Sequence, residues 1–184
     1  MQRRFRYWVV VAVIAAGCAG PATDQPAVSD ATDVWFMQHL VPHLRQTSSI
    51  VGLSRDRITN PGLARLADTI DEQGQAHLQV LQGWLDRRGL APHAHSHQGV
   101  DLRRRSDLDR LSQAPGPRFD LAFLEVMAAR HRAGGKLAAI ELAQGSLPEV
   151  RQLARQLQAE HRRQLRQMTA WRNVWSGTDR PGPA

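Results

Sequence analysis

Histidine and methionine are the side chains of this sequence whose types and positions could hold a metal ion. Imidazole and thioether are intermediate to soft ligands, which suit copper, especially the reduced ion, better than magnesium or calcium. Side chains that converge from facing helices commonly build the metal sites of helical bundles. The predicted ligands lie on or beside apolar stripes of helical spacing, and they are His43, His77, Met127, His131, His161 and Met168.

These six residues also have an explanation that needs no metal. A single histidine on an apolar face is more often a hydrogen-bonded core residue than a ligand. Four histidines on four helices make the two explanations about equal, because each buried imidazole needs a partner. Methionines alone are more often packing residues, because methionine fills irregular gaps in a core. Both explanations stay open from the sequence.

Further histidines form secondary candidate sites. His93, His95 and His97 alternate in a short polar segment that could surround one zinc, copper or nickel ion, although a solvated loop explains them as well. His39 and His43 lie four residues apart and are another candidate pair, with Pro42 between them disturbing helical geometry.

The elements that must position these side chains are helices. Apolar periodicity and capping signals predict four of them, over residues 33–57, 61–88, 117–144 and 148–176. Thr32 or Asp33 can cap the first helix, and Asn60 followed by Pro61 opens the second. A short helix is also expected near residues 101–111, and no segment indicates a strand.

The chain is an internal duplication of one helical hairpin. Shifting residues 33–85 by 87 positions aligns 8 identical residues, among them Asp33 with Asp120 and Trp84 with Trp171. Repeat one covers residues 33–89, the crossover residues 90–117 and repeat two residues 118–176. Two antiparallel hairpins with a long crossover predict an all-α four-helix bundle over residues 32–176.

The N-terminus carries the signals of export and lipid attachment. Residues 1–17 combine a basic start with a short apolar run, which is typical of a signal peptide. Cys18, the only cysteine, stands in a setting that resembles a bacterial lipobox, where the thiol takes a diacylglyceryl group. We expect a lipid-anchored protein on the extracytoplasmic face of the cell membrane, with residues 18–31 as a flexible tether. An ordinary cleaved signal peptide is the alternative, and residues 177–184 are expected to be a disordered tail.

Composition argues against nucleic-acid binding and against an enzyme. Without the three leader arginines, 21 basic residues oppose 17 acidic residues, a mild surplus. The Glu-x-x-His motif of di-iron bundles is absent, because Gly74 and Gln158 stand three residues before His77 and His161. No acid, base or nucleophile constellation is present, so no reaction is expected, and the sequence does not identify a protein partner.

The repeats resemble the bacterial ferritin-like domain-of-unknown-function family 305 (DUF305). The resemblance covers about residues 32–175 and rests on Phe36-Met37, Pro42-His43-Leu44 and Trp84-Leu85 in repeat one, with Phe123-Leu124, Arg130-His131 and Trp171 in repeat two. It implies a ferritin-like bundle, often secreted or periplasmic, with links to copper binding and copper tolerance through methionine and histidine in some members.

This chain departs from the family pattern at the ligand positions. The His-His pair of each repeat has lost one member, to Leu44 in the first and to Arg130 in the second, and leucine replaces the methionines expected at 40 and 81. Arg130 is a permanent cation that disfavours a bound cation unless an acid such as Glu125 or Glu141 neutralises it. Two hypotheses follow: binding or buffering of a soft metal, copper above all, or a structural or interaction lipoprotein that has lost the metal.

Overall fold

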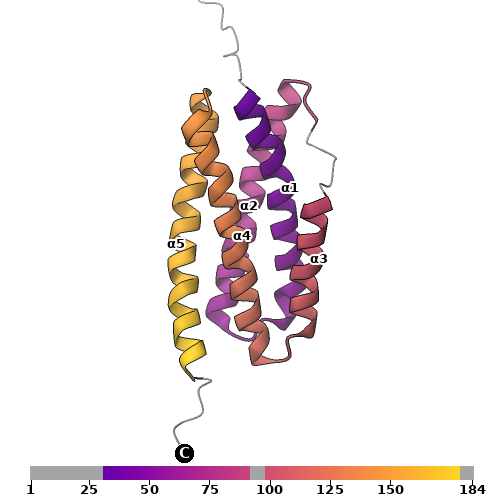
Figure 1. Ribbon diagram of the computed structural model, residues 1–184, viewed down its shortest axis with the longest axis vertical. Coiled ribbons are helices and arrows are strands. Elements are labelled where there is room, and N and C mark those ends of the chain that lie inside the picture. The colour runs from indigo at the N-terminus through magenta and orange to yellow at the C-terminus, as the bar shows by residue number, and fades with distance from the viewer. Residues whose placement is uncertain (1–30, 92–97, 179–184) are drawn as a thin grey trace, which may run out of the picture.

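The computed structural model describes residues 31–91 and 98–178, and helices dominate both parts. In chain order the elements are α1 (Ala31–Ser54), a 3₁₀ turn (Arg55–Arg57), α2 (Pro61–Arg87), α3 (Gln98–Gln113), α4 (Pro117–Gln144) and α5 (Pro148–Thr178). Figure 1 shows α1, α2, α4 and α5 side by side as long parallel rods, with α3 beside them. The predicted all-α bundle is confirmed.

Several sequence predictions fall outside the described residues. They are the signal peptide (1–17), Cys18 with its lipid, most of the tether, the three histidines His93, His95 and His97, and the last six residues. The described helices include none that is both long enough and apolar enough to span a membrane. The predicted tail begins too early, since α5 continues to Thr178.

Local sequence signals explain where the helices begin and end. Asn60 caps α2, its side-chain oxygen accepting hydrogen bonds from the amides of Gly62 (2.8 Å) and Leu63 (3.1 Å), while Pro61 occupies the first turn. Gly89 follows α2 with a φ of 62°, a left-handed conformation that glycine adopts without strain. The expected short helix in the crossover is longer than predicted, because α3 covers 16 residues.

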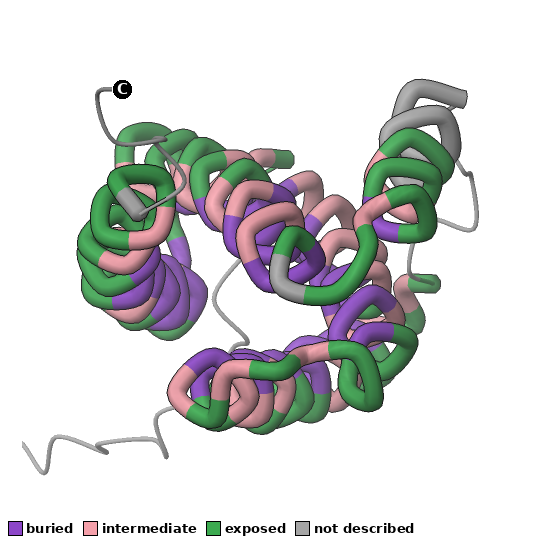
Figure 2. The backbone as a smooth tube through the Cα atoms, turned by 90° about the horizontal axis from the view of Figure 1, so that it is seen from below, coloured by how far each residue is buried: buried purple, intermediate pink, exposed green. Residues whose placement is uncertain are grey.

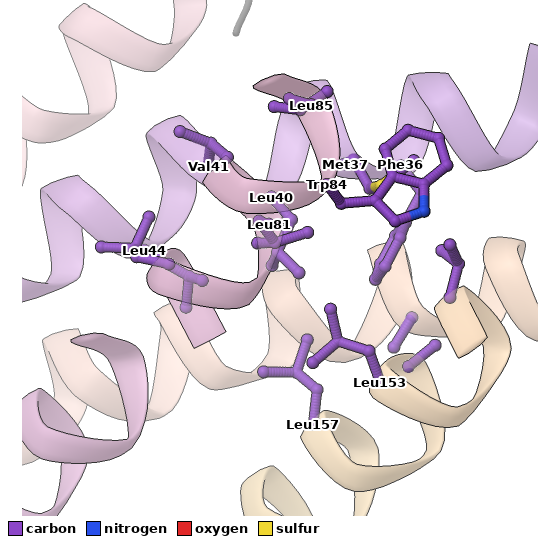
Figure 3. Close-up of a cluster of buried hydrophobic side chains, with 14 of the residues drawn as sticks. Phe36, Met37, Leu40, Val41, Leu44, Leu81, Trp84, Leu85, Leu153 and Leu157 are labelled. Atoms are coloured by element: carbon purple, nitrogen blue, oxygen red, sulfur yellow. The ribbon is translucent and has the colours of Figure 1, made fainter. Parts of the chain in front are cut away.

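The bundle holds two apolar clusters, one toward each end. The upper cluster, shown in Figure 3, joins the first half of α1 with the second half of α2 and the facing parts of α4 and α5, and includes Phe36, Leu40, Leu81, Trp84 and Leu157. The lower cluster joins the other halves, and includes Ile50, Leu63, Phe123, Met127 and Met168. Figure 2 shows the buried faces of the four long helices turned toward a common axis.

The duplication is visible as an exchange of hydrogen bonds between the repeats. Asp33 at the start of α1 accepts bonds from the amides of Ser146 and Leu147 (3.1 Å each) and from the Ser146 hydroxyl (2.8 Å). Asp120 at the start of α4 accepts bonds from the amide and hydroxyl of Thr59 and from the Asn60 amide, at 2.8–2.9 Å. Each repeat therefore caps the turn of the other.

Candidate metal centre

A layer of polar side chains crosses the bundle between the two apolar clusters. Each of the four long helices contributes at least one member, and the layer surrounds a cavity of about 20 Å³. That volume is enough for one water molecule or one ion. The polar residues around it are His43, Thr47, Ser48, Gln73, His77, His131, Glu160, His161 and Gln164. The structure thus gathers all four predicted histidines in one place.

Gly134 of α4 makes room for two of these imidazoles. A Cβ atom added at this glycine would lie 2.9 Å from Nε2 of His43 and 3.1 Å from Nδ1 of His161, and only 2.5 Å from Cε1 of His161. The two nitrogens therefore approach the same point beside the α4 backbone, one from α1 and one from α5. Nδ1 of His161 is buried without a hydrogen-bond partner among the described residues. A buried ring nitrogen without a hydrogen-bond partner lowers the stability of the fold, so it calls for an explanation such as a bound ion or water.

His131 is held in place by the protein. Its Nδ1 lies 2.8 Å from the carbonyl oxygen of Met127, and its Nε2 lies 2.7 Å from Oε1 of Gln164. Its ring also lies against that of His161, with centroids 4.4 Å apart. A neutral imidazole has one ring hydrogen and can donate to only one of these oxygens. In this conformation His131 lines the cavity but offers no nitrogen to a ligand, because both of its nitrogens face protein oxygens.

His77 has an acidic partner. Its Nε2 lies 2.8 Å from Oε2 of Glu160 on α5, and both side chains are largely buried. One helical turn away, the amide nitrogen of Gln164 donates a 3.0 Å bond to Oε1 of Gln73. These two contacts join α2 to α5 at the edge of the cavity.

Burial favours the neutral form of three cavity histidines, His43, His131 and His161. Burial, with smaller effects of the Arg130 and His131 charges, lowers the pKa of His43 from 6.5 to about 3. Burial, with smaller effects of the His131 and His43 charges, lowers the pKa of His161 to about 2, against a hydrogen bond with the His131 backbone that raises it. Burial also lowers the pKa of His131, against hydrogen bonds that raise it. Neutral imidazole is the form that binds metal ions, so protons do not compete for these nitrogens near pH 7.

Arg130 places a buried cation next to the cavity. Its guanidinium donates to the Thr47 hydroxyl (3.0 Å) and to the His43 carbonyl (3.1 Å). The acid that pairs with it is Asp107 of α3, at 3.5 Å. The two acids named from the sequence are placed otherwise: Glu125 pairs with Arg110, and Glu141 lies beside Gly145 at the end of α4.

The remaining predicted ligands lie away from the cavity. Met127 and Met168 are packed in the lower apolar cluster, and neither lines the cavity. His39 stacks on Trp35, with ring centroids 4.2 Å apart, and its Nδ1 lies 2.7 Å from the Trp35 carbonyl oxygen. Among the described side chains, no group of three histidine, cysteine, aspartate or glutamate residues is arranged to hold a metal ion. Among the predicted ligands, His43 and His161 are the two whose ring nitrogens approach one point.

Sequence reasoning missed the residues that shape this cavity. Gly134 was not predicted to provide the space into which two imidazoles fit. Glycine inside a helical pattern often has a packing or functional reason, and that signal was available. Gln73 and Glu160, which hold Gln164 and His77, carry no pattern that separates them from other surface glutamines and glutamates.

Comparison with known families identifies one family for this chain. Residues 33–172 match the sequence model of the domain of unknown function DUF305. A DUF305 fragment from Deinococcus radiodurans has the same fold, with a TM-score of 0.71 and 22% identity over 79% of this chain and 98% of the fragment. Comparison with curated protein sequences gives no match.

Two further proteins of known structure share the fold at low identity. A putative secreted DUF305 protein from Streptomyces coelicolor has a TM-score of 0.66 and 20% identity, over 74% of this chain and 89% of its own. CopM in its Cu(I)-bound form has a TM-score of 0.68 and 20% identity, over 79% of this chain and 99% of its own. CopM is also known in a Cu(II)-bound form, with a TM-score of 0.69, 21% identity and coverage of 78% and 97%.

Proposed function

The chain belongs to the DUF305 family, and from this premise we propose that it binds a soft monovalent metal ion, Cu(I), between His43 and His161. The observation that carries the proposal is that Nε2 of His43 and Nδ1 of His161 approach one point beside Gly134, at 2.9 Å and 3.1 Å from the position of an added Cβ atom. One of them, Nδ1 of His161, has no partner within the described residues. Copper is among the metals that imidazole suits, and Cu(I) accepts as few as two ligands.

The charges around the cavity favour a monovalent ion over a divalent one. Arg130 adds a permanent positive charge beside His43, and Asp107 offsets it only from 3.5 Å. The repulsion between Arg130 and a bound ion doubles when the ion carries two charges. The pair of neutral imidazoles brings no negative charge of its own. Cu(I) therefore fits this environment better than Zn²⁺ or Cu²⁺.

The CopM structures with bound copper support the proposal at the level of the fold. This chain would be a binding or buffering member with a reduced ligand set, and the methionines in its lower cluster serve packing. Anchoring to the outer face of the cell membrane through Cys18 is part of the same proposal and rests on the N-terminal sequence alone.

A competition titration tests the site. The purified full chain is titrated with Cu(I) against a chromogenic chelator, beside His43→Ala, His161→Ala and a deletion of residues 93–97. We expect one ion per chain, lost in both single variants and kept in the deletion. His39→Ala is the matched control, since His39 lies on the same helix and outside the cavity.

Two results would overturn the proposal. Binding that disappears with residues 93–97 and survives both histidine variants would place the ion outside the bundle. Absence of binding in every protein would favour the structural or interaction lipoprotein, with the histidines as hydrogen-bonded core residues.

A further inference from the structure

Side chains, rather than close backbone packing, join α2 to α5. The helix pairs α1–α2, α1–α4 and α4–α5 pack closely, and α2–α5 is not among the closely packed pairs. Two contacts cross between them: Gln164 to Gln73 at 3.0 Å and His77 to Glu160 at 2.8 Å. The two contacts lie one helical turn apart on each helix. Residue numbers rise along one helix and fall along the other, as expected for antiparallel helices. We call this line of contact the α2–α5 seam.

An open groove lies on the outer side of the seam. It has a volume of about 370 Å³ and runs between α2 and α5. Three of its lining residues, Gln73, Glu160 and Gln164, also line the inner cavity. The wall between groove and cavity is therefore made of side chains: Gln164 bonds to both Gln73 and His131, and Glu160 bonds to His77. The two ends of the bundle are closed by the apolar clusters.

We infer that the α2–α5 seam is the entry route, or port, through which the ion reaches His43 and His161. The port opens when the hydrogen bond between the Gln73 and Gln164 amides breaks. This inference rests on the proposed function. A neutral amide–amide bond contributes about 1 kcal/mol net, so thermal motion opens it often. Opening either apolar cluster instead would expose several large side chains to water at a much higher cost.

Amide oxygens also suit the passage of a cation. When the pair separates, the carbonyl oxygen of Gln73 is released and can replace part of the hydration of an ion as it moves inward, while that of Gln164 is bonded to His131. The outer rim carries Arg65 and Arg163 together with Glu160, so it does not attract free cations by charge. The opening of the amide pair, rather than electrostatic steering, is then the step that limits the rate of exchange.

Two measurements on the full chain test the port. In stopped-flow experiments, Gln73→Ala should accelerate both capture of Cu(I) and its release to a chelator, by about 2- to 10-fold, with little change in affinity. In the apo protein, diethylpyrocarbonate should modify His161 faster by a similar factor, as mapped by mass spectrometry. Gln75→Ala is the matched control, because Gln75 lies on the same helix and bonds Ser48 outside the seam.

The outcomes separate this inference from the proposed function. Unchanged Cu(I) exchange and unchanged labelling in Gln73→Ala would overturn the port even if the wild-type protein binds copper. Equal acceleration in Gln75→Ala would also overturn it, because the effect would then be general loosening. If the wild-type chain binds no Cu(I), the proposed function fails. The rate at which diethylpyrocarbonate modifies His161 still shows whether small molecules reach the cavity through the seam. Should Gln73→Ala not fold, Glu160→Ala opens the neighbouring contact and is expected to accelerate both processes.

Discussion

Asp33 of repeat one bonds to a turn of repeat two, and Asp120 of repeat two bonds to a turn of repeat one. The carboxylate of Asp33 accepts three hydrogen bonds from the turn before α5, and that of Asp120 accepts three from the turn before α2. Both side chains are buried, at 0% and 5% exposure, so water cannot replace these bonds if they are lost.

Removing one of these carboxylates should therefore be costly. We expect Asp33→Ala to lower the free energy of unfolding by about 2–3 kcal/mol, because it leaves buried backbone amides without an acceptor. Asp120→Ala should have a similar effect. Urea denaturation measures both, and Asp86→Ala, at an exposed position, should change stability by less than about 0.5 kcal/mol. A loss no greater than this control would show that the exchanged bonds contribute little.

Two adjacent glycines in α4 should respond in opposite ways to the same substitution. Gly134→Ala places a methyl group 2.5 Å from the His161 ring, so it should destabilise the protein by about 1–3 kcal/mol and abolish Cu(I) binding. Gly135→Ala meets nothing within 4 Å, and should stabilise the helix by up to about 1 kcal/mol with copper binding intact. Thermal unfolding and the chelator titration distinguish them. Copper binding that survives Gly134→Ala would argue against the His43–His161 site.

The apo protein should lose stability as the pH falls below 7. The pKa of His43 drops to about 3 and that of His161 to about 2 on folding, while in the unfolded chain both remain near 6.5. The unfolded state therefore binds protons below pH 6.5 that the folded state does not. This contribution to the free energy of unfolding is complete above pH 6.5. It is lost progressively as the pH falls toward the folded-state pKa values of about 3 and about 2.

This dependence can be measured between pH 7 and 5, above the ordinary range of carboxyl groups. Each of the two histidines should remove on the order of 1 kcal/mol per pH unit once the pH is below 6.5. Replacing His43 and His161 together by leucine should make the curve shallower, since His131 remains as a buried histidine with a lowered pKa, and His39→Ala is the control. Parallel curves for all three proteins would contradict the assignment.

Charge substitutions next to the cavity should alter ion selectivity. Arg130→Met removes a positive charge beside His43, so it should improve binding of Zn²⁺ more than binding of Cu(I), by on the order of 10-fold for the divalent ion. Asp107→Asn removes the neutralising acid and should act in the opposite direction. Competition titrations with both ions give the ratio. Equal changes for Zn²⁺ and Cu(I) would show that Arg130 acts through packing alone.

The sequence predicted the helices far better than the details of the site. Apolar spacing and caps such as Asn60-Pro61 are local signals, and they placed the four long helices within a few residues. The inward histidines followed from the same periodicity. The length of α3 was missed because its sequence is polar, and its contact with the bundle depends on tertiary packing, as at the buried Leu111.

Other features depend on contacts that no local pattern contains. Asp33 was expected to cap its own helix, and the structure shows its carboxylate bonded to a turn more than 100 residues away. A buried arginine was expected to pair with an acid. The acid that pairs with Arg130 is Asp107 of α3, which could be identified only from the position of that helix in the fold. Met127 and Met168 share the inner faces with the histidines, but they sit at a different height along the bundle and so belong to the lower cluster.

The position of the two proposed ligands has a consequence for how such a site could arise. His43 corresponds to Arg130 in the other repeat, and His161 corresponds to Gly74, since equivalent positions are 87 residues apart. In a dimer of two identical hairpins, every ligand present in one half would be present in the other as well. A site with histidine at 43 and 161, but with Arg130 and Gly74 at the equivalent positions, therefore needs two halves whose sequences differ.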